Sequence, residues 1–167
     1  MLHAQQLGAR GLDFAAQQAF QCIGHQALQR GHALQLHLGR VKQRMAAEGL
    51  DVLVVTEPAN IYYLTGYDAW SFYTTQALVV FQEAELPLWI GRMMDALTAR
   101  VTTYLPDDRV VPYPDIYVNA KDRHAAQFIA ERILREAPST AVIGVEMKVG
   151  AGCITAPRRW ADSPAHR

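Results

Sequence analysis

The side chains best suited to recognition gather in one short segment, residues 58–73, which reads PANIYYLTGYDAWSFY. Aromatic faces bind cyclic and cationic groups by stacking and by cation–π contact, and they keep water out of a site. They do not supply the proton transfers that hydrolysis requires. The same rings pack readily into a core, so recognition and loop packing both stay open for each of them. The aromatic residues of the segment are Tyr62, Tyr63, Tyr67, Trp70, Phe72 and Tyr73.

Three histidines in the N-terminal part, His25, His32 and His37, raise the question of a metal site. Metal sites on a helix usually place two ligands four residues apart with a carboxylate close by. No acidic residue lies between Asp13 and Glu48, and the spacing of these histidines is seven and five residues. The pattern therefore favours solvated histidines, and we expect no metal here.

Other residues with reactive side chains lack the neighbours that would activate them. Ser71 follows Asp68 closely, but there is no G-x-S-x-G turn around it and no histidine nearby. Asp107 and Asp108 come after a proline, which is typical of a turn. The glycine pair at 150–152 is not followed by the Lys-Ser/Thr of a phosphate loop. We expect no catalytic residue and no cofactor in this chain.

Length, composition and charge narrow the class of protein. The 167 residues are 50% hydrophobic and 19% charged, which suits one ordinary domain core. The formal net charge is zero, so nothing favours nucleic acid or an anionic membrane as a partner. The two cysteines, Cys22 and Cys153, show no disulfide or zinc spacing, and no apolar run approaches a membrane span. These features predict a cytoplasmic protein.

Alternating helices and short apolar strands must position the aromatic segment. Strands that are apolar on both faces indicate a sheet covered on both sides, so the predicted fold is α/β, a layered mixed sheet flanked by helices. Val54, Val79 and Ile143 are expected to be fully buried in it. A helix over 92–102 is expected to bury a stripe of Met93, Ala96, Leu97 and Val101. The predicted strands are 51–55, 75–81, 88–91, 109–113 and 141–145, and the predicted helices are 40–49, a turn ending at Gly66, 92–102 and 121–137.

Composition divides the chain into three parts. Residues 1–37 form an atypical Gln- and His-rich extension, residues 38–146 carry the regular patterns of a domain, and residues 147–167 read as an irregular tail. Only the middle part has enough apolar periodicity to offset the entropy of ordering. The folded region is therefore expected to span about Leu38 to Val145.

The middle part also resembles a known family. The segments TGYDAWSFY, PLWIGRMMDA and VVPYPDIYV, together with the preceding helix, are similar to the N-terminal domain of the creatinase and aminopeptidase P (Xaa-Pro peptidase) family. Within it they look most like the ectoine hydrolase branch, which hydrolyses a C–N bond of a small cyclic amidine. The likeness runs from about Leu38 to Glu146. It implies the layered α/β fold of creatinase and prolidase N-terminal domains.

The resemblance also implies a role without catalysis. In that family the catalytic residues lie in a C-terminal domain that is not in this sequence, so we expect a truncated, inactive chain. The N-terminal domain of one subunit helps to cover the substrate pocket of its dimer partner. Carried over, this makes Tyr67, Trp70 and Phe72 the candidates for substrate covering or an interface, with some of them facing solvent. The expected partner is a second copy or a relative that has the catalytic domain.

Two alternatives to this role stay open at the level of sequence. The chain is a module that binds a protein or a small ligand without chemistry, or it is a remnant open reading frame without activity. The aromatic segment favours the first of these alternatives, and the atypical composition of both ends favours the second.

Overall fold

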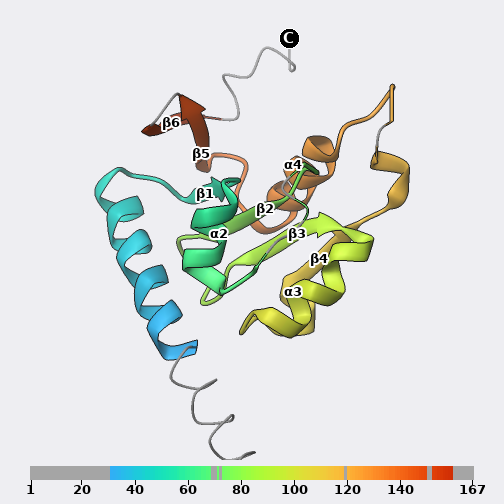
Figure 1. Ribbon diagram of the computed structural model, residues 1–167. Helices are drawn as coiled ribbons and strands as arrows, with labels where there is room; N and C mark the ends of the chain where they lie inside the picture. The colour runs from blue at the N-terminus through green and yellow to red at the C-terminus, as the bar shows by residue number, and fades with distance from the viewer. Residues whose placement is uncertain (1–30, 69–70, 72, 119, 150–151, 160–167) are drawn as a thin grey trace, which may run out of the picture.

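A computed structural model describes residues 31–68, 71, 73–118, 120–149 and 152–159 of the chain. In this part of the chain the strands form one six-stranded mixed sheet in the order β4-β3-β2-β1-β5-β6 (Figure 1). The β1–β5 and β3–β4 pairs are parallel, and the other pairs are antiparallel. The elements are a helix over 31–47, β1 Val52–Val55, α2 Pro58–Thr65, β2 Ala77–Phe81, β3 Leu88–Arg92, α3 Ala96–Thr102, β4 Val110–Tyr113, α4 Ala125–Glu136, β5 Val142–Val149 and β6 Gly152–Arg159, with 3-10 turns at Met93–Asp95, Asp107–Arg109 and Asp115–Tyr117.

Strand β2 lies inside the sheet, and all five of its residues are buried. Its side chains alternate between two cores, as the period of a strand requires. Leu78 and Val80 face one core, whereas Ala77, Val79 and Phe81 face the other. The prediction of a sheet covered on both sides is therefore confirmed, and Val54, Val79 and Ile143 are all buried.

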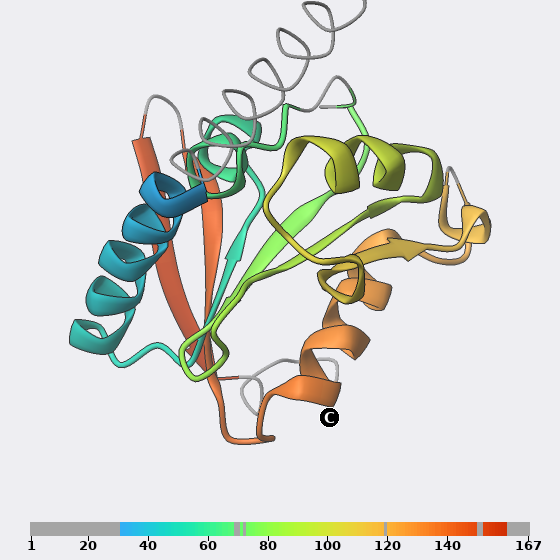
Figure 2. The same cartoon turned by 90° about the horizontal axis from the view of Figure 1, so that it is seen from below.

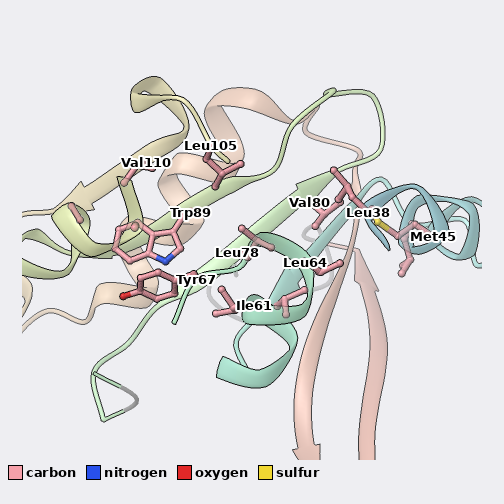
Figure 3. Close-up of a cluster of buried hydrophobic side chains, with 14 residues drawn as sticks. Leu38, Met45, Ile61, Leu64, Tyr67, Leu78, Val80, Trp89, Leu105 and Val110 are labelled. Carbon is pink, nitrogen blue, oxygen red and sulfur yellow. The ribbon is translucent and has the colours of Figure 1, made fainter. Parts of the chain in front are cut away.

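Helices cover the two faces unequally. The helix over 31–47, α2 and α3 lie on one side of the sheet, and α4 lies on the other (Figure 2). Helix α4 presents Ala125, Ile129 and Ile133 to its core, and Phe128 is partly buried beside them. The first core contains Leu38 and Met45 of the N-terminal helix, Ile61 and Leu64 of α2, and the large rings of Tyr67 and Trp89 (Figure 3).

Helix α3 corrects one prediction about packing. Of the expected stripe only Ala96 is buried, while Met93, Leu97 and Val101 are 51%, 68% and 76% exposed. The second buried residue of α3 is Ala99, three residues after Ala96. Two alanines at this spacing make a flat stripe against which the sheet packs closely, and the larger apolar side chains are turned outward. Size of the buried residue, not apolarity, decided the orientation.

The two predicted boundaries of the domain differ from the structure. The first helix is already formed at residue 31, inside the predicted extension. The prediction of an irregular segment after residue 146 is wrong, because β5 continues to Val149 and pairs with β6 from Val142↔Arg159 to Val149↔Gly152. Pairing satisfies the backbone groups along the edge of β5, a gain that local composition does not reveal. Residues 1–30 and 160–167 lie outside the described residues.

Candidate functional site

The aromatic segment starts from a helix whose first turn is held by a distant carboxylate. Helix α2 has proline at its first position and no cap from the side chain of Glu57. Glu146 of β5 accepts hydrogen bonds from the backbone N–H groups of Thr56 and Glu57, at 2.8 and 2.7 Å, through one oxygen. Its other oxygen accepts from the side-chain amide of Asn60. A carboxylate accepts hydrogen bonds from the unpaired N–H groups at the start of a helix, and the positive end of the helix dipole stabilises its negative charge.

The helix ends at Gly66, as predicted. Gly66 has φ 78°, the left-handed conformation that glycine adopts without steric cost, and its N–H donates to the carbonyl of Tyr62. The hydroxyl of Thr65 donates to the Ile61 carbonyl at 2.7 Å and accepts from the Tyr67 N–H at 3.1 Å. These contacts turn the chain sharply and direct Tyr67 back into the domain.

Of the three candidate residues, Tyr67 is the one that the structure describes. It is 1% exposed, and its ring meets the edge of Trp89 with centroids 5.2 Å apart (Figure 3). Burial, and next the nearby Asp95, raise the pKa of Tyr67 to about 12. Tyr67 thus packs in the domain's own core. Trp70 and Phe72 lie outside the described residues, so their exposure stays a prediction.

Other aromatic residues of the segment are exposed. Tyr62 and Tyr63 lie on the outer face of α2, and Tyr73 is 65% exposed. Tyr63 stacks on His37 with ring centroids 4.0 Å apart, and Nδ1 of His37 lies 3.1 Å from the Tyr63 carbonyl. Helical periodicity could have identified the outward face of α2, because Ile61 and Leu64 turn inward.

An ion pair beside the segment was not found by sequence reasoning. Arg92, at the end of β3, forms two hydrogen bonds with Asp95, at 3.0 and 3.2 Å, and both side chains are only 15% exposed. The Arg92 guanidinium also lies 5.8 Å from the ring centre of Tyr73, in cation–π range. The Asp95 hydrogen bonds raise the pKa of Arg92. Arginine three residues before aspartate, directly after an apolar strand, was the available signal.

Exposed apolar side chains border this ion pair. Met93, Met94 and Leu97 are 51%, 69% and 68% exposed, and Val101 follows them along α3. We call these four residues the α3 patch. Methionine and arginine are enriched at the centres of protein interfaces, and methionine adapts to irregular partner surfaces. The arrangement suits contact with another protein surface.

Some buried polar atoms in this part of the domain are unpaired. Ser71 Oγ, Trp89 Nε1 and both amide atoms of Gln76 have no hydrogen-bond partner, and these three residues are 2%, 0% and 5% exposed. Gln76 was also missed from sequence, although a glutamine directly before an all-apolar strand is an unusual neighbour. Across the described ranges, no three His, Cys, Asp or Glu side chains are grouped to hold a metal, and no helix is both long and apolar enough to cross a bilayer.

Comparison with known proteins identifies the family of this domain. A family model described as the Creatinase/Prolidase N-terminal domain matches residues 37–154, which include the aromatic segment and the α3 patch. The chain belongs to the Creatinase/Prolidase N-terminal domain family. The matched residues begin near the predicted boundary at Leu38 and continue into β6.

Two curated relatives of this chain are much longer proteins than the chain itself. An uncharacterized hydrolase/peptidase of Sinorhizobium fredii is 69% identical over 108 residues, which cover 65% of this chain and 28% of that protein. Ectoine hydrolase of Halomonas elongata is 42% identical over 111 residues, which cover 66% of this chain and 28% of the enzyme. The chain therefore spans less than a third of the length of these relatives.

Solved structures agree on the fold of the Creatinase/Prolidase N-terminal domain. The N-terminal domain of an Xaa-Pro dipeptidase from Lactobacillus brevis superposes with a TM-score of 0.53 at 19% identity, covering 68% of this chain and 80% of that one. Dipeptidase PepE of Mycobacterium ulcerans has the same TM-score and identity, covering 72% of this chain and 30% of that one. The predicted α/β fold is confirmed.

Proposed function

We propose that this chain serves as a non-catalytic N-terminal domain of a creatinase-like hydrolase related to ectoine hydrolase. In this role it contributes to dimerisation and to covering the substrate pocket of a partner. The observation that carries the proposal is the match of 42% identity to ectoine hydrolase, which falls within 28% of that enzyme's length. The substrate that the partner would hydrolyse is ectoine or a similar small cyclic molecule.

The side chains of the described region support a covering role more than a chemical one. Tyr67, the buried candidate, has a pKa raised to about 12, so it stays protonated near neutral pH and does not act as a base. Arg92 and Asp95 neutralise each other's charge, because Arg92 Nε lies 3.0 Å from Asp95 Oδ2. What the region offers a partner is apolar and aromatic surface, in the α3 patch and at Tyr73. Such surface excludes water and orients a substrate without taking part in bond cleavage.

An activity assay tests the non-catalytic half of the proposal. Purified chain is incubated with ectoine, and ring opening is followed by chromatography. We expect no turnover above the buffer control. Robust hydrolysis that disappears on substitution of a residue within this chain would contradict the proposal.

An association experiment tests whether the chain binds a second copy of itself or a full-length relative. The chain is mixed at micromolar concentration with full-length ectoine hydrolase of Halomonas elongata, or kept alone, and its mass is measured by size-exclusion chromatography with light scattering. We expect association in one of the two samples, and its loss in a variant carrying both Met94→Ser and Leu97→Ser. The matched control is Leu134→Ser, which removes an exposed leucine from α4 on the other side of the sheet. A monomer in both samples would count against the proposal.

A cytoplasmic setting belongs to the same proposal. It is supported by the two cysteines, which lack disulfide spacing. Fractionation of cells that express the tagged chain would test it, and recovery in the membrane fraction would contradict it.

A further inference from the structure

The first turn of helix α4 is capped by a histidine. His124 precedes the helix with extended backbone, and its Nδ1 accepts a hydrogen bond from the Ala126 N–H at 3.0 Å. In return, the side-chain oxygen of Gln127 accepts from the His124 N–H at 3.1 Å. This is the reciprocal arrangement of a capping box, in which the first residue is usually serine or threonine. Histidine differs from these residues, because a proton can occupy its acceptor near neutral pH.

The hydrogen bond determines which ring nitrogen carries the proton. A nitrogen that accepts must keep its lone pair, so the neutral ring of His124 holds its proton on Nε2. Protonation of the ring places a hydrogen on both nitrogens and removes the acceptor. It also places a positive charge at the N-terminal end of a helix, where the helix dipole disfavours cations. Both effects have the same sign, so the charged imidazole does not cap α4.

The charged neighbours of His124 leave this sign unchanged. Asp122 and Arg123 form an ion pair at 2.9 Å, and the hydrogen bond from Arg123 holds the pKa of Asp122 below its usual value. Lys121 adds another positive charge before the helix, and the first acidic residue within α4 is Glu131, about two turns further on. His124 itself is exposed, so protons reach it from solvent.

The turns that follow the cap carry contacts of the second core. Ala125 is buried, and the Phe128 ring meets the rings of Tyr113 and Tyr117 with centroids 6.4 and 5.7 Å apart. These two tyrosines belong to β4 and to the 3-10 turn after it, in which the charged residue is Asp115. Opening of the first turn of α4 therefore loosens the contact between α4 and the end of β4.

A second histidine of the domain uses its ring in the opposite way. Nδ1 of His37 lies 3.1 Å from the Tyr63 carbonyl, which can only accept, so His37 donates. A charged imidazole makes this bond equally well. Its stacking on the Tyr63 ring also tolerates the charge, because an aromatic face attracts cations. His37 is thus a control within the same chain.

We propose that His124 is a proton-sensitive cap of α4. The first turn of α4 is closed while the imidazole is neutral, and it opens when the imidazole is protonated. Stability from the cap is therefore present at the upper end of the range in which histidine titrates, about pH 5–8, and is lost as the pH falls through that range. This inference does not depend on the proposed covering role, because the cap and its helix lie within this chain.

Nuclear magnetic resonance of the full chain tests the geometry directly. Imidazole nitrogen-proton spectra at pH 8 report the tautomer of each histidine, with signals assigned through the variants His124→Asn and His37→Gln. We expect the Nε2–H form for His124 and an Nδ1–H for His37. From pH 8 to pH 5, the Ala126 amide and the Cα signals of residues 125–128 should shift toward random-coil values together with the His124 ring, while the Tyr63 signals keep their helical values.

Two substitutions of His124 separate the cap from its titration. His124→Asn keeps an acceptor that does not titrate, and His124→Ala removes the acceptor at every pH. In urea unfolding, the parent should match the asparagine variant at pH 8 and approach the alanine variant at pH 5. Relative to the asparagine variant, the unfolding constant of the parent should rise about fivefold, the usual effect of losing a helix cap. His37→Gln should retain the pH response of the parent.

Three results would overturn the proposal. The first is an Nδ1–H tautomer of neutral His124, since such a ring cannot accept from the Ala126 amide. The second is an equal change in stability of the parent and of His124→Asn between pH 8 and pH 5. The third is a set of signals for residues 125–128 that stays unchanged while the His124 ring titrates.

Discussion

Replacing Glu146 with alanine is expected to loosen the segment that leads into the aromatic residues. Glu146 lies on β5, about ninety residues after the backbone groups that it binds. Its carboxylate accepts from the N–H groups of Thr56 and Glu57 at 2.8 and 2.7 Å, and from the amide of Asn60. Alanine removes all of these acceptors at once and leaves the first turn of α2 without a cap.

The size of the effect follows from the number and exposure of these bonds. A hydrogen bond to a charged group contributes about 1.5–3 kcal/mol when it is well shielded. The Thr56 bond is exposed and the Glu57 bond is part-buried, so water replaces part of what is lost. We therefore expect a decrease of about 2–3 kcal/mol in the free energy of unfolding for Glu146→Ala. Glu146→Gln should lose about 1 kcal/mol, because one amide oxygen can still accept both N–H groups.

Urea unfolding followed by circular dichroism measures the stability, and amide hydrogen exchange at Thr56 and Glu57 locates the change. Exchange at these two amides should become faster in Glu146→Ala. The control is Glu131→Ala, on the exposed side of α4, which should stay within about 0.5 kcal/mol of the parent. If Glu146→Ala unfolds like Glu131→Ala and the two amides keep their protection, the anchoring role of Glu146 is refuted.

Three further predictions address the core, the turn and the titration of tyrosine. Val79→Asp should destabilise the domain by about 4 kcal/mol or more, since it places an unpaired charge at a residue that is 0% exposed, and a variant that melts like the parent would contradict the assignment of β2. Gly66→Ala should cost about 1–2 kcal/mol in urea unfolding, because φ is 78° and the added Cβ would lie 3.3 Å from a backbone carbonyl of α3. Gly39→Ala, in the open middle of a helix, should be neutral or stabilising, and equal losses at both glycines would refute this account. The pKa values of Tyr67 and Tyr104 are raised to about 12 by burial, while the unfolded chain titrates near 10, so the folded state retains more protons in between and stability should fall as the pH rises from about 10 to 12. A tyrosinate absorbance titration of the parent and of Tyr67→Phe checks this, and a midpoint near pH 10 for every tyrosine would contradict it.

Strands with apolar residues on both faces were predictable, because a strand that is buried on both sides has apolar residues at consecutive positions. The run 77–81 has no polar residue, and both of its faces are in fact covered. Helix α4 was equally predictable, since Ala125, Ile129 and Ile133 recur at helical spacing and the remaining positions are mostly polar. Gly66 was readable as a helix end for a different reason, the rarity of left-handed backbone in other residues.

The inward face of α3 could not be predicted from apolarity. The helix offers both alanines and larger apolar residues, and the closeness of the sheet selects Ala96 and Ala99. The same limit applied to Tyr67, for which both recognition and core packing were compatible with the sequence. Its burial depends on Trp89, a residue 22 positions later that meets it only after the sheet has formed.

The amino-acid sequence by itself determined the periodicities of the elements, the C-terminal ends of α2 and α4, and the family of the domain. These are local properties, because hydrophobic period, proline and glycine act within a few residues of the chain. Only the tertiary structure decided which face of α3 turns inward, that β6 pairs with β5, and that Glu146 anchors α2. Each of these contacts joins residues that are distant along the chain, so its energy depends on where the fold places the partner.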